Sequence, residues 1–296
     1  MTILFPSSYF HSKKVDEAFQ KEYEAALYAG FDILLFDQPS WDNEKKIKLL
    51  TPNSELCTRE VQNISLYRGW MMKPEEYEQF YNDLKGQGVC LITSPEEYLT
   101  CHCFPHVYLH VTQDTPKIKV YPNLSYEDEI DISTLQSEFD RFFIKDFVKS
   151  AKNTNFPKYF DKNTTQEEFN QCLKQFFEIR GSLFTGGIVV KEFVDLKKYA
   201  DKTNEYRAFY LNGEVVSVSR NSLQSHITPE VPKELVEKYR NLPSSFYTVD
   251  FAEKENGEWI VIETGDGGVS GLSERQDYNA FFRALHVAQE YEIERD

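Results

Sequence analysis

Two acidic residues in the last third of the chain are the first candidates for chemistry. Asn256 and Gly257 separate two apolar runs, and an Asn-Gly pair in this setting is the strongest short-range signal for a β-hairpin. If these residues form the turn, Asp250 lies directly opposite Glu263, with Cβ atoms about 4.5–5.5 Å apart. Like charges at paired positions destabilise a hairpin, and a divalent cation such as Mg²⁺ would offset that cost. Two unrelated acids on a solvated face are the alternative, and a register one residue away would break the pairing.

The residues around this acid pair favour a site. The other face of the hairpin carries four apolar residues that predict contact with a core: Val249, Phe251, Ile260 and Ile262. The stretch 264–271, TGDGGVSG, follows Glu263 and contains four glycines, which allow the backbone to approach a ligand closely. A plain flexible turn is the alternative, but it would not need so many glycines beside two acids. We therefore interpret the stretch as part of a binding site.

An arginine on a second hairpin is a candidate for binding an anion. The pair Asn212-Gly213 predicts a turn between two strands. The resulting register pairs Arg207 with Val218, and Glu205 with Arg220. Arg207 then lies among apolar neighbours, where an unpaired charge is costly. Either an acid such as Glu205 or Glu263 neutralises it, or it binds phosphate or carboxylate through bidentate hydrogen bonds.

Two lysines stand at the ends of apolar strands. Lys145 follows the run FFI, and Lys191 follows the run IVV. A lysine at a strand end can reach a ligand that lies on the sheet, and in an acidic chain such lysines are candidates for an anionic ligand. Lys149 and Lys152 fit better the alternative of surface lysines that keep their charged heads in water.

The first third of the chain alternates strand and helix patterns. Short apolar runs at 3–5, 31–36 and 89–92 predict strands, and the periodic segments 16–29 and 74–84 predict helices. Strand–helix–strand units of this spacing predict a parallel sheet with helices on its faces.

The rest of the chain has a different pattern. The segment 113–138 is acidic and interrupted by prolines, so we expect a connection between domains there. Strands are expected at 142–144 and 188–190, and helices at 166–179 and 278–291.

Composition limits the classes of function. The chain has 296 residues, with 33 Lys and Arg against 48 Asp and Glu, which gives a net charge of −15. This balance argues against a protein that coats nucleic acid or binds an anionic membrane, because both need clustered cations. No apolar run approaches the roughly 20 residues of a membrane span, no signal peptide is recognised, and the five cysteines predict no disulfide framework. We expect a cytoplasmic protein.

Two further sites come into question. Two cysteines and three histidines lie close together, namely Cys101, His102, Cys103, His106 and His110. Cys-x-Cys is not the common zinc spacing, so buried thiols with partly exposed histidines are favoured over a metal site. Arg68, in the stretch YRGW, is a candidate anchor for an anionic group of a substrate, with stacking on Trp70 at the surface as the alternative.

The order of these features resembles the ATP-grasp superfamily, and most closely its clade named for two arginines and one lysine. The resemblance covers nearly the whole chain. It rests on the stretches ILFPSSYF, AGFDILLFD, YRGWMM, RFFIKDFVKSAK, IVVKEFVDL, EYRAFYLNGEVVSVS and YTVDFAEKENGEWIVIETGDGGVSGL. It implies an N-terminal α/β domain similar to a pre-ATP-grasp domain over 1–115. A two-lobed α+β ATP-grasp domain with antiparallel hairpins would follow over 116–296, with lobes at about 116–195 and 196–296.

The resemblance also implies which residues hold the nucleotide. Lys145 and Lys191 would contact the ATP phosphates or the adenine edge, and Lys145 would also be catalytic. Glu205 is assigned to the nucleotide as well. Adenine would bind at a hinge, largely through the backbone of three consecutive residues, Glu192, Phe193 and Val194.

The remaining implied roles concern the metal and the reacting phosphate. Asp250 and Glu263 would hold Mg²⁺, and Arg207 would be catalytic, facing the γ-phosphate or an acyl phosphate. Many ATP-grasp enzymes have Glu-x-Asn at the second metal strand, whereas the third position here is Gly265. Asp266 is assigned as the replacement ligand.

The implied activity is ATP- and Mg²⁺-dependent ligation of a carboxylate to an amine or another nucleophile, with a peptide or amino acid as the expected substrate. The carboxylate would attack the γ-phosphate to give an acyl phosphate, and the nucleophile would then displace phosphate. Two alternatives stay open. One is a nucleotide-binding interaction or sensor protein that does not ligate. The other is a kinase on the same scaffold that phosphorylates a hydroxyl.

Overall fold

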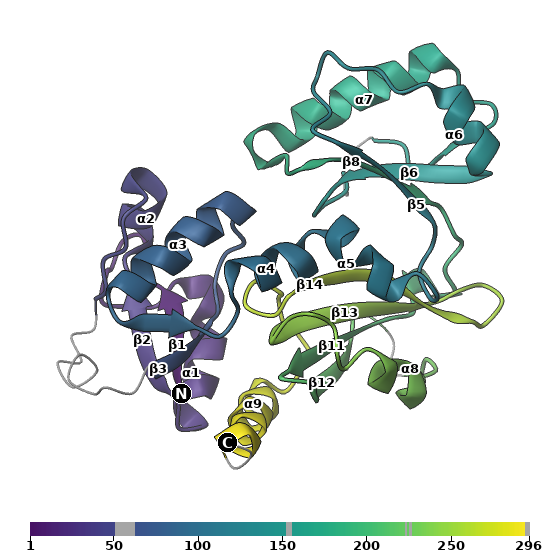
Figure 1. Cartoon of the computed structure of the whole chain (residues 1–296). Helices are drawn as coiled ribbons and strands as arrows, with labels where there is room; N and C mark the ends of the chain where they lie inside the picture. The colour runs from purple at the N-terminus through teal and green to yellow at the C-terminus, as the bar shows by residue number, and fades with distance from the viewer. Residues whose placement is uncertain (51–62, 152–155, 223, 225–226, 294–296) are drawn as a thin grey trace.

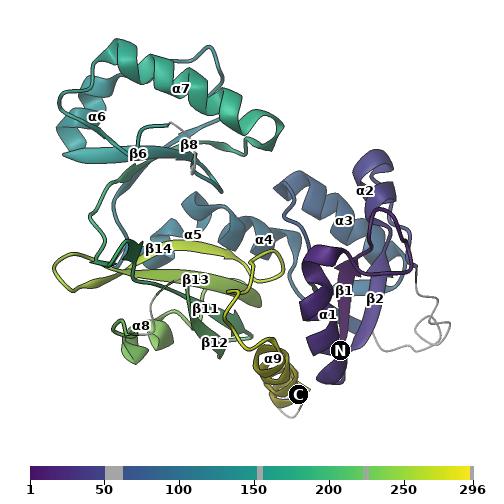
Figure 2. The same cartoon turned by 180° about the vertical axis from the view of Figure 1, so that it is seen from behind.

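Three four-stranded sheets with helices on their faces build the described part of the molecule (Figure 1). The computed structural model describes residues 1–50, 63–151, 156–222, 224 and 227–293. Within these ranges no helix has the length and apolar character that crossing a membrane requires. The N-terminal sheet, a small lobe and a large lobe follow one another along the chain (Figures 1 and 2).

The N-terminal sheet is parallel, as the alternation of strands and helices predicts. Its order is β2-β1-β3-β4, with β1 Thr2–Pro6, β2 Asp32–Phe36, β3 Asn63–Tyr67 and β4 Val89–Leu91. Its helices are η1 Glu17–Phe19, α1 Gln20–Tyr28, α2 Gln38–Glu44 and α3 Pro74–Gly86. Because side chains alternate along a strand, Phe5 packs in the core with α1, whereas Leu4 packs in the core with α2 and α3.

The small lobe is an antiparallel sheet whose outer face is covered by two helices (Figure 1). The strand order is β5-β8-β6-β7, with β5 Ile118–Pro122, β6 Arg141–Asp146, β7 Phe160–Asp161 and β8 Gly187–Glu192. The helices are α6 Ile132–Glu138 and α7 Gln166–Arg180, followed by η3 Gly181–Leu183. α7 begins with a capping box between Thr165 and Glu168, and it buries three side chains at helical spacing, Phe169, Leu173 and Phe176.

The expectation of a mere connection at 113–138 is wrong. β5 pairs with β8, and α6 contributes Ile132 and Leu135 to the core of the small lobe. The strand was not predicted because the segment contains prolines, and proline interrupts the sequence pattern of a strand. Pro122 is tolerated here because β5 is an edge strand and Pro122 is its last residue.

The large lobe is an antiparallel sheet in the order β12-β11-β13-β14. Its strands are β11 Glu205–Leu211, β12 Glu214–Arg220, β13 Phe246–Glu253 and β14 Trp259–Asp266, preceded by the short pair β9 Lys198–Tyr199 and β10 Lys202–Thr203. Its helices are α8 Lys233–Lys238 and α9 Tyr278–Ile293. α4 Pro95–His102 and α5 Phe104–Val111 pack against β14, and α9 lies against α1 (Figure 2).

The first predicted hairpin has the expected turn but a shifted register. Asn212 and Gly213 form the turn, and Leu211 pairs with Glu214. One extra residue in β12 then makes a bulge, so Arg207 pairs with Ser219 and not with Val218. The same shift pairs Arg220 with Tyr206 instead of the predicted Glu205.

The second hairpin places Asp250 opposite Glu263, as predicted, although its turn differs. The last pair before the turn is Glu253 with Trp259, so the turn is longer than the predicted two residues. A bulge in β14 restores the predicted pairing beyond it. The bulge also exchanges which residues face the core, and Val261 rather than Ile262 packs there with Val249.

One glycine at the start of β8 is required by packing, and it gives a test of the small lobe. A Cβ at Gly187 would lie 2.4 Å from the backbone oxygen of Tyr121 in β5. Backbone atoms cannot rotate away, so Gly187→Ala should lower the free energy of unfolding by about 1–3 kcal/mol. The matched control is Gly86→Ala at the end of α3, where a Cβ meets nothing within 4 Å. Chemical denaturation of both variants checks this, and equal stability would contradict the packing of β5 on β8.

Candidate active site

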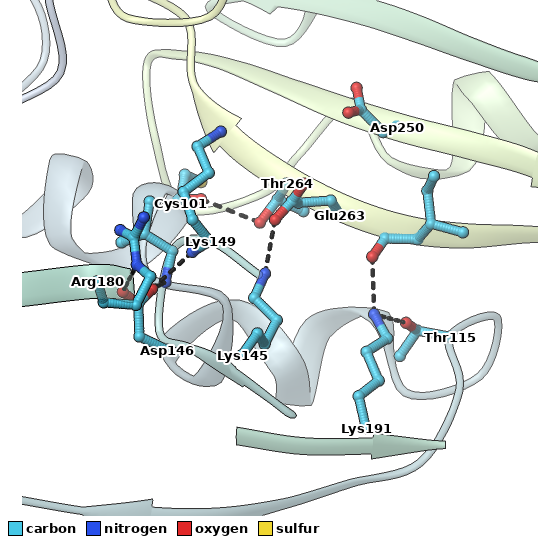
Figure 3. A network of polar contacts seen from close by, with 12 residues as sticks. Cys101, Thr115, Lys145, Asp146, Lys149, Arg180, Lys191, Asp250, Glu263 and Thr264 are labelled. Atoms are coloured by element: carbon cyan, nitrogen blue, oxygen red, sulfur yellow. Dashed lines mark hydrogen bonds and ion pairs between the residues drawn. The ribbon is translucent and has the colours of Figure 1, made fainter. Parts of the chain in front are cut away.

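Asp250 and Glu263 each have a cationic partner from a different element. Arg207 of β11 donates two hydrogen bonds of 2.7 Å to the two carboxylate oxygens of Asp250. Lys145 of β6 donates a 2.6 Å hydrogen bond to Glu263 (Figure 3). The repulsion predicted between the two acids is therefore offset by protein cations. Neither of the partners predicted for Arg207 is the one observed, because the strand beside β11 presents Asp250.

The two strand-end lysines reach across from the small lobe to the large lobe. Lys191 Nζ donates a 2.7 Å hydrogen bond to the carbonyl oxygen of Ile262, at the bulge of β14 (Figure 3). Both lysines lie over the ring of Phe104, with Lys191 Nζ 3.9 Å and Lys145 Nζ 5.6 Å from its centroid. Burial, followed by the nearby charge of Lys145, lowers the pKa of Lys191 to about 7.

Burial and the neighbouring acids have opposite effects on the pKa of Arg207. Although burial opposes the charged form, Asp250 raises the pKa of this guanidinium above its usual value, with smaller contributions from Glu263 and Glu205. Glu205 itself accepts a hydrogen bond from Thr203 and lines a cavity beside Arg207. The acids thus hold a permanently charged group at the centre of the site.

A cavity of about 160 Å³ lies at the acid pair, where the three parts of the chain meet. Met71 lines it from the N-terminal sheet with its helices η1 and α1–α3, here called the N-terminal domain, Lys149 lines it from the small lobe, and Asp250 from the large lobe. The acid pair and residues of the glycine-rich stretch form the rest of its wall, together with Arg207, Thr248, Val148 and His102. His102 is buried, and burial lowers the pKa of its imidazole to about 3.

Steric contacts explain why position 265 is glycine and not the asparagine expected from the resemblance. A Cβ at this position would lie 2.8 Å from Ser270 Oγ and 3.0 Å from Thr248 Oγ1. These two hydroxyls are 3.0 Å apart and also line the cavity. A pair of hydroxyls therefore occupies the space that an asparagine side chain would need.

Asp266 lies away from the acid pair. Its side chain is 1% exposed and accepts hydrogen bonds from the backbone N–H groups of Gly268 and Val269. Adjacent residues of a strand face opposite sides, so Asp266 points away from the face of Gly265. It does not line the cavity, and this position argues against its assignment as a metal ligand.

Arg68 is neither an exposed anion anchor nor a surface partner of Trp70. It is 1% exposed, and it donates hydrogen bonds of 2.7 and 2.9 Å to Glu22 of α1. Its remaining nitrogen donates to the carbonyl oxygens of Gly267 and Ser270. A buried ion pair thus attaches the glycine-rich stretch to the N-terminal domain, and the sequence pattern carried no signal for it.

The predicted hinge lies at the end of β8. The amide of Glu192 donates to Lys117, and that of Phe193 donates to Arg141, so both donors are engaged within the small lobe. The ring of Phe193 lies 4.8 Å from that of Tyr159, measured between centroids. Val194 follows directly in the chain. Contacts of adenine with the first two residues would therefore use groups other than these amides.

The remaining candidates have structural surroundings. Cys101 and Cys103 are buried free thiols beside helix ends, and His106 is exposed. In the ranges that the structure describes, no cluster of three or more His, Cys, Asp or Glu side chains could hold a metal ion. Lys152 lies outside the described residues.

The sequence did not single out two residues that hold the turn beside the cavity, Asp146 and Arg180. Asp146, at the end of β6, is fully buried and accepts a 2.7 Å hydrogen bond from Arg180 of α7 (Figure 3). It also accepts hydrogen bonds from the amides of Val148 and Lys149, which fixes the turn beside the cavity. The position of Asp146 directly after Lys145 in the sequence is the pattern that could have indicated this role.

The Arg68–Glu22 pair predicts a large loss of stability when one partner is removed. Arg68→Ala leaves a buried carboxylate without its cation, so unfolding should become easier by about 3–5 kcal/mol. Glu22→Gln should also be destabilising, whereas the double variant Arg68→Met, Glu22→Leu should recover part of the loss. Denaturant titration of all three checks this. A single variant as stable as wild type would contradict the buried pairing.

The raised pKa of buried Asp266 predicts that the stability of the protein depends on pH in a specific way. Burial raises its pKa to about 7, although the backbone N–H groups of Gly268 and Val269 and the charge of Arg68 oppose the shift. Because the folded protein binds this proton more tightly than the unfolded chain, the contribution to stability is full at low pH. It is lost as pH rises from about 4 to about 7. Asp266→Asn keeps the acceptor oxygen and does not titrate. The stability of wild type relative to this variant should fall across that window, and a constant difference would contradict the shift.

Comparisons with known proteins identify the family of the chain. The chain matches the sequence model of an ATP-grasp domain, family 3 of the clade named for two arginines and one lysine. The match covers residues 135–285, just over half of the chain. A search of curated proteins finds no match.

Solved structures share the fold over nearly the whole chain. D-cycloserine synthetase DcsG is 12% identical with a TM-score of 0.59, and 97% of this chain and 99% of that chain are covered. The ATP-grasp ligase PsnB, complexed with a phosphomimetic precursor variant, Mg and ADP, is 11% identical with a TM-score of 0.60 and 98% of each chain covered. The D-alanine–D-alanine ligase from Bacillus anthracis, complexed with ATP, is 13% identical with a TM-score of 0.57 and 98% of each chain covered. The fold is therefore that of ATP-grasp ligases, and the chain belongs to family 3 of the two-arginine, one-lysine clade of ATP-grasp domains.

Proposed function

We propose that this chain is an ATP- and Mg²⁺-dependent ligase that joins a carboxylate to an amine or another nucleophile. The observation that carries the proposal is the set of charges at the cavity between the lobes. Two carboxylates, Asp250 and Glu263, lie at paired positions, and Arg207 and Lys145 bind them directly. Membership of the ATP-grasp family and the fold shared with ligases support this reading of the site.

The donor set fits a magnesium ion. Carboxylate oxygens are hard ligands, and Mg²⁺ in proteins is commonly held by one or two carboxylates plus substrate phosphates and water. Asp250 and Glu263 would supply the protein ligands. When bound, the metal would neutralise charge on the transferred phosphoryl group and orient it.

The cations fit the phosphates of ATP. Lys145 and Lys191 project from the small lobe toward the acids, and Arg207 projects from the large lobe. Nucleotide phosphates would exchange partners with the carboxylates, so that Lys145 and Arg207 contact phosphate while the acids contact metal. Lys191 has a pKa near neutrality because it is buried, and an anionic phosphate beside it would favour its charged form.

The reaction would proceed in two displacements. A substrate carboxylate oxygen would attack the γ-phosphorus of ATP, forming a P–O bond and releasing ADP. An amine would then attack the acyl carbon, forming a C–N bond and releasing phosphate, with its proton passing to solvent. Arg207 would stabilise charge on the transferred phosphoryl group and on the acyl phosphate. Positioning and charge stabilisation are the main requirements of such chemistry.

The decisive experiment measures ADP release by the full chain. Mg²⁺-ATP should raise the melting temperature, because ligand at 100 times its dissociation constant contributes about 2.7 kcal/mol. A carboxylate together with an amine should stimulate ADP release more than the carboxylate alone. A kinase would instead release ADP with a hydroxyl substrate and ignore the amine. A thermal shift without any turnover would favour the nucleotide-binding sensor.

The acid pair provides the mutational test. Asp250→Asn and Glu263→Gln should each lower stimulated ADP release by about a hundredfold or more, because several kcal/mol of charge stabilisation are lost. Both variants should melt at or below the wild-type temperature, since a cation loses its carboxylate. The matched control is Glu258→Gln on the same hairpin, whose carboxylate is exposed and pairs with Lys254. Near-normal turnover in both site variants would rule out the metal assignment.

A further inference from the structure

Lys149 is an exposed lysine that also lines the proposed active site. The sequence pattern favours a plain surface position, with the charged head in water. The structure instead places Lys149 in the wall of the 160 Å³ cavity, together with Arg207 and the acid pair Asp250 and Glu263. Lys149 belongs to the small lobe and Arg207 to the large lobe. Two cations therefore reach the same cavity from different lobes.

A buried ion pair fixes the turn that carries Lys149. Asp146 is fully buried at the end of β6, and Arg180 of α7 donates a 2.7 Å hydrogen bond to one oxygen of its carboxylate. The other oxygen accepts hydrogen bonds of 2.8 and 2.6 Å from the amides of Val148 and Lys149. The amide of Asp146 donates a 2.9 Å hydrogen bond to the carbonyl of Lys149, which closes the turn. In Figure 3 the side chain of Lys149 extends from this turn toward the large lobe.

The turn also brings Lys149 beside the lysine already proposed for the phosphates. Ser150 forms an antiparallel bridge with Lys145, so the chain folds back on the end of β6. Taking the charges of Asp146 and Arg180 out of water costs free energy, and such a buried pair gives a defined position in return. The defined position here is that of Lys149 at the cavity.

Lys149 differs from the other cations of the site in its partners. Three of them, Lys145, Lys191 and Arg207, each bind a carboxylate or a carbonyl of the large lobe. In the part of the chain that the structure describes, Lys149 Nζ has no hydrogen bond or ion pair. Burial and then the charge of Lys149 are the main causes that lower the pKa of His102, in the same cavity wall, to about 3. An anion that enters the cavity can thus bind Lys149 without breaking an ion pair.

The size of the cavity and the charges of the reaction identify this anion. Sites for whole drug-sized ligands measure about 300–1,000 Å³. A cavity of 160 Å³ therefore fits a phosphoryl group and an adjoining carboxylate rather than a whole nucleotide. In the proposed reaction a carboxylate approaches the γ-phosphate, although both groups are negative. Positive charge placed at the transferred group stabilises the transition state of such a step.

We propose that Lys149 binds the phosphoryl group that is transferred, across the cavity from Arg207, and that Asp146 and Arg180 are its positioning residues. This inference rests on the proposed ligase function and adds a catalytic residue to it. Lys149 would contact the γ-phosphate of ATP and remain in contact when the group has become the acyl phosphate. It acts by charge alone. The carboxylate oxygen forms the new P–O bond, and ADP leaves with the electron pair of the broken bond.

The test compares a triphosphate with a diphosphate, because only the triphosphate has a γ-phosphate. Calorimetry measures the binding of AMPPNP and of ADP to the full chain with Mg²⁺. Lys149→Met should weaken AMPPNP binding about tenfold, equivalent to about 1.4 kcal/mol, and change ADP binding by less than about twofold. Lys149→Arg should recover part of the loss, because it keeps the charge. The matched control is Lys162→Met, since Lys162 is an exposed lysine of the small lobe that pairs with Asp140 and does not line the cavity.

Turnover and the positioning pair provide further readouts. Lys149→Met should lower the maximal rate of stimulated ADP release by about tenfold or more. Asp146→Asn keeps the oxygen that accepts from the two amides but loses the charge that binds Arg180. It should therefore reproduce the selective loss of AMPPNP binding. A purely structural role of Asp146 would lower the melting temperature and weaken both nucleotides alike.

The outcomes separate this inference from the proposed function. The melting temperature of each variant reports its folding. Wild-type affinity for AMPPNP in Lys149→Met would overturn the role of Lys149, and so would an equal loss for AMPPNP and ADP, because neither result involves the γ-phosphate alone. In both cases the wild type would still bind AMPPNP and release ADP from ATP. A wild type that binds neither nucleotide would instead overturn the proposed function itself.

Discussion

Two carboxylates held at paired positions of neighbouring strands repel each other, and the site is organised by the cations that offset this repulsion. Asp250 takes its cation from the adjacent strand, through Arg207. Glu263 takes its cation from the other lobe, through Lys145. The same electrostatic requirement therefore shapes the large sheet and also joins the two lobes. The cations, which are suited to phosphate, and the carboxylates, which are suited to a metal ion, therefore stabilise one another within the protein.

Local irregularities in the strands place these groups. The bulge in β14 lies next to Glu263, and the carbonyl of Ile262 at this bulge accepts the hydrogen bond from Lys191. The bulge in β12 changes which residue pairs with Arg207. Bulges re-aim side chains and backbone groups at functional sites, and the bulge in β14 lies directly beside Glu263, which lines the cavity. Regular strand pairing is thus interrupted next to the proposed active site.

The N-terminal domain lines the cavity through Met71 and is joined to the glycine-rich stretch by an ion pair. Arg68 and Glu22 form a buried pair, and Arg68 also binds the backbone of the large lobe at Gly267 and Ser270. Asp266 fixes the turn of the same segment from within. The glycine-rich stretch is therefore held in place by the N-terminal domain, although it belongs to the large lobe. Such a buried pair gives a defined position at an energetic cost.

The sequence by itself determined the elements whose signals are local. The parallel N-terminal sheet, α3, α7 and the placement of Asp250 opposite Glu263 follow from apolar periodicity and turn residues, which act over a few positions. The partners of Arg207 and Lys145, and the burial of Arg68 and Asp266, were decided by tertiary structure. These contacts join residues far apart in the chain, and a single pattern of residue types does not encode which charges will meet. Even the correct pairing of the acids depended on a longer turn and a bulge that compensate each other, which only the packed sheet reveals.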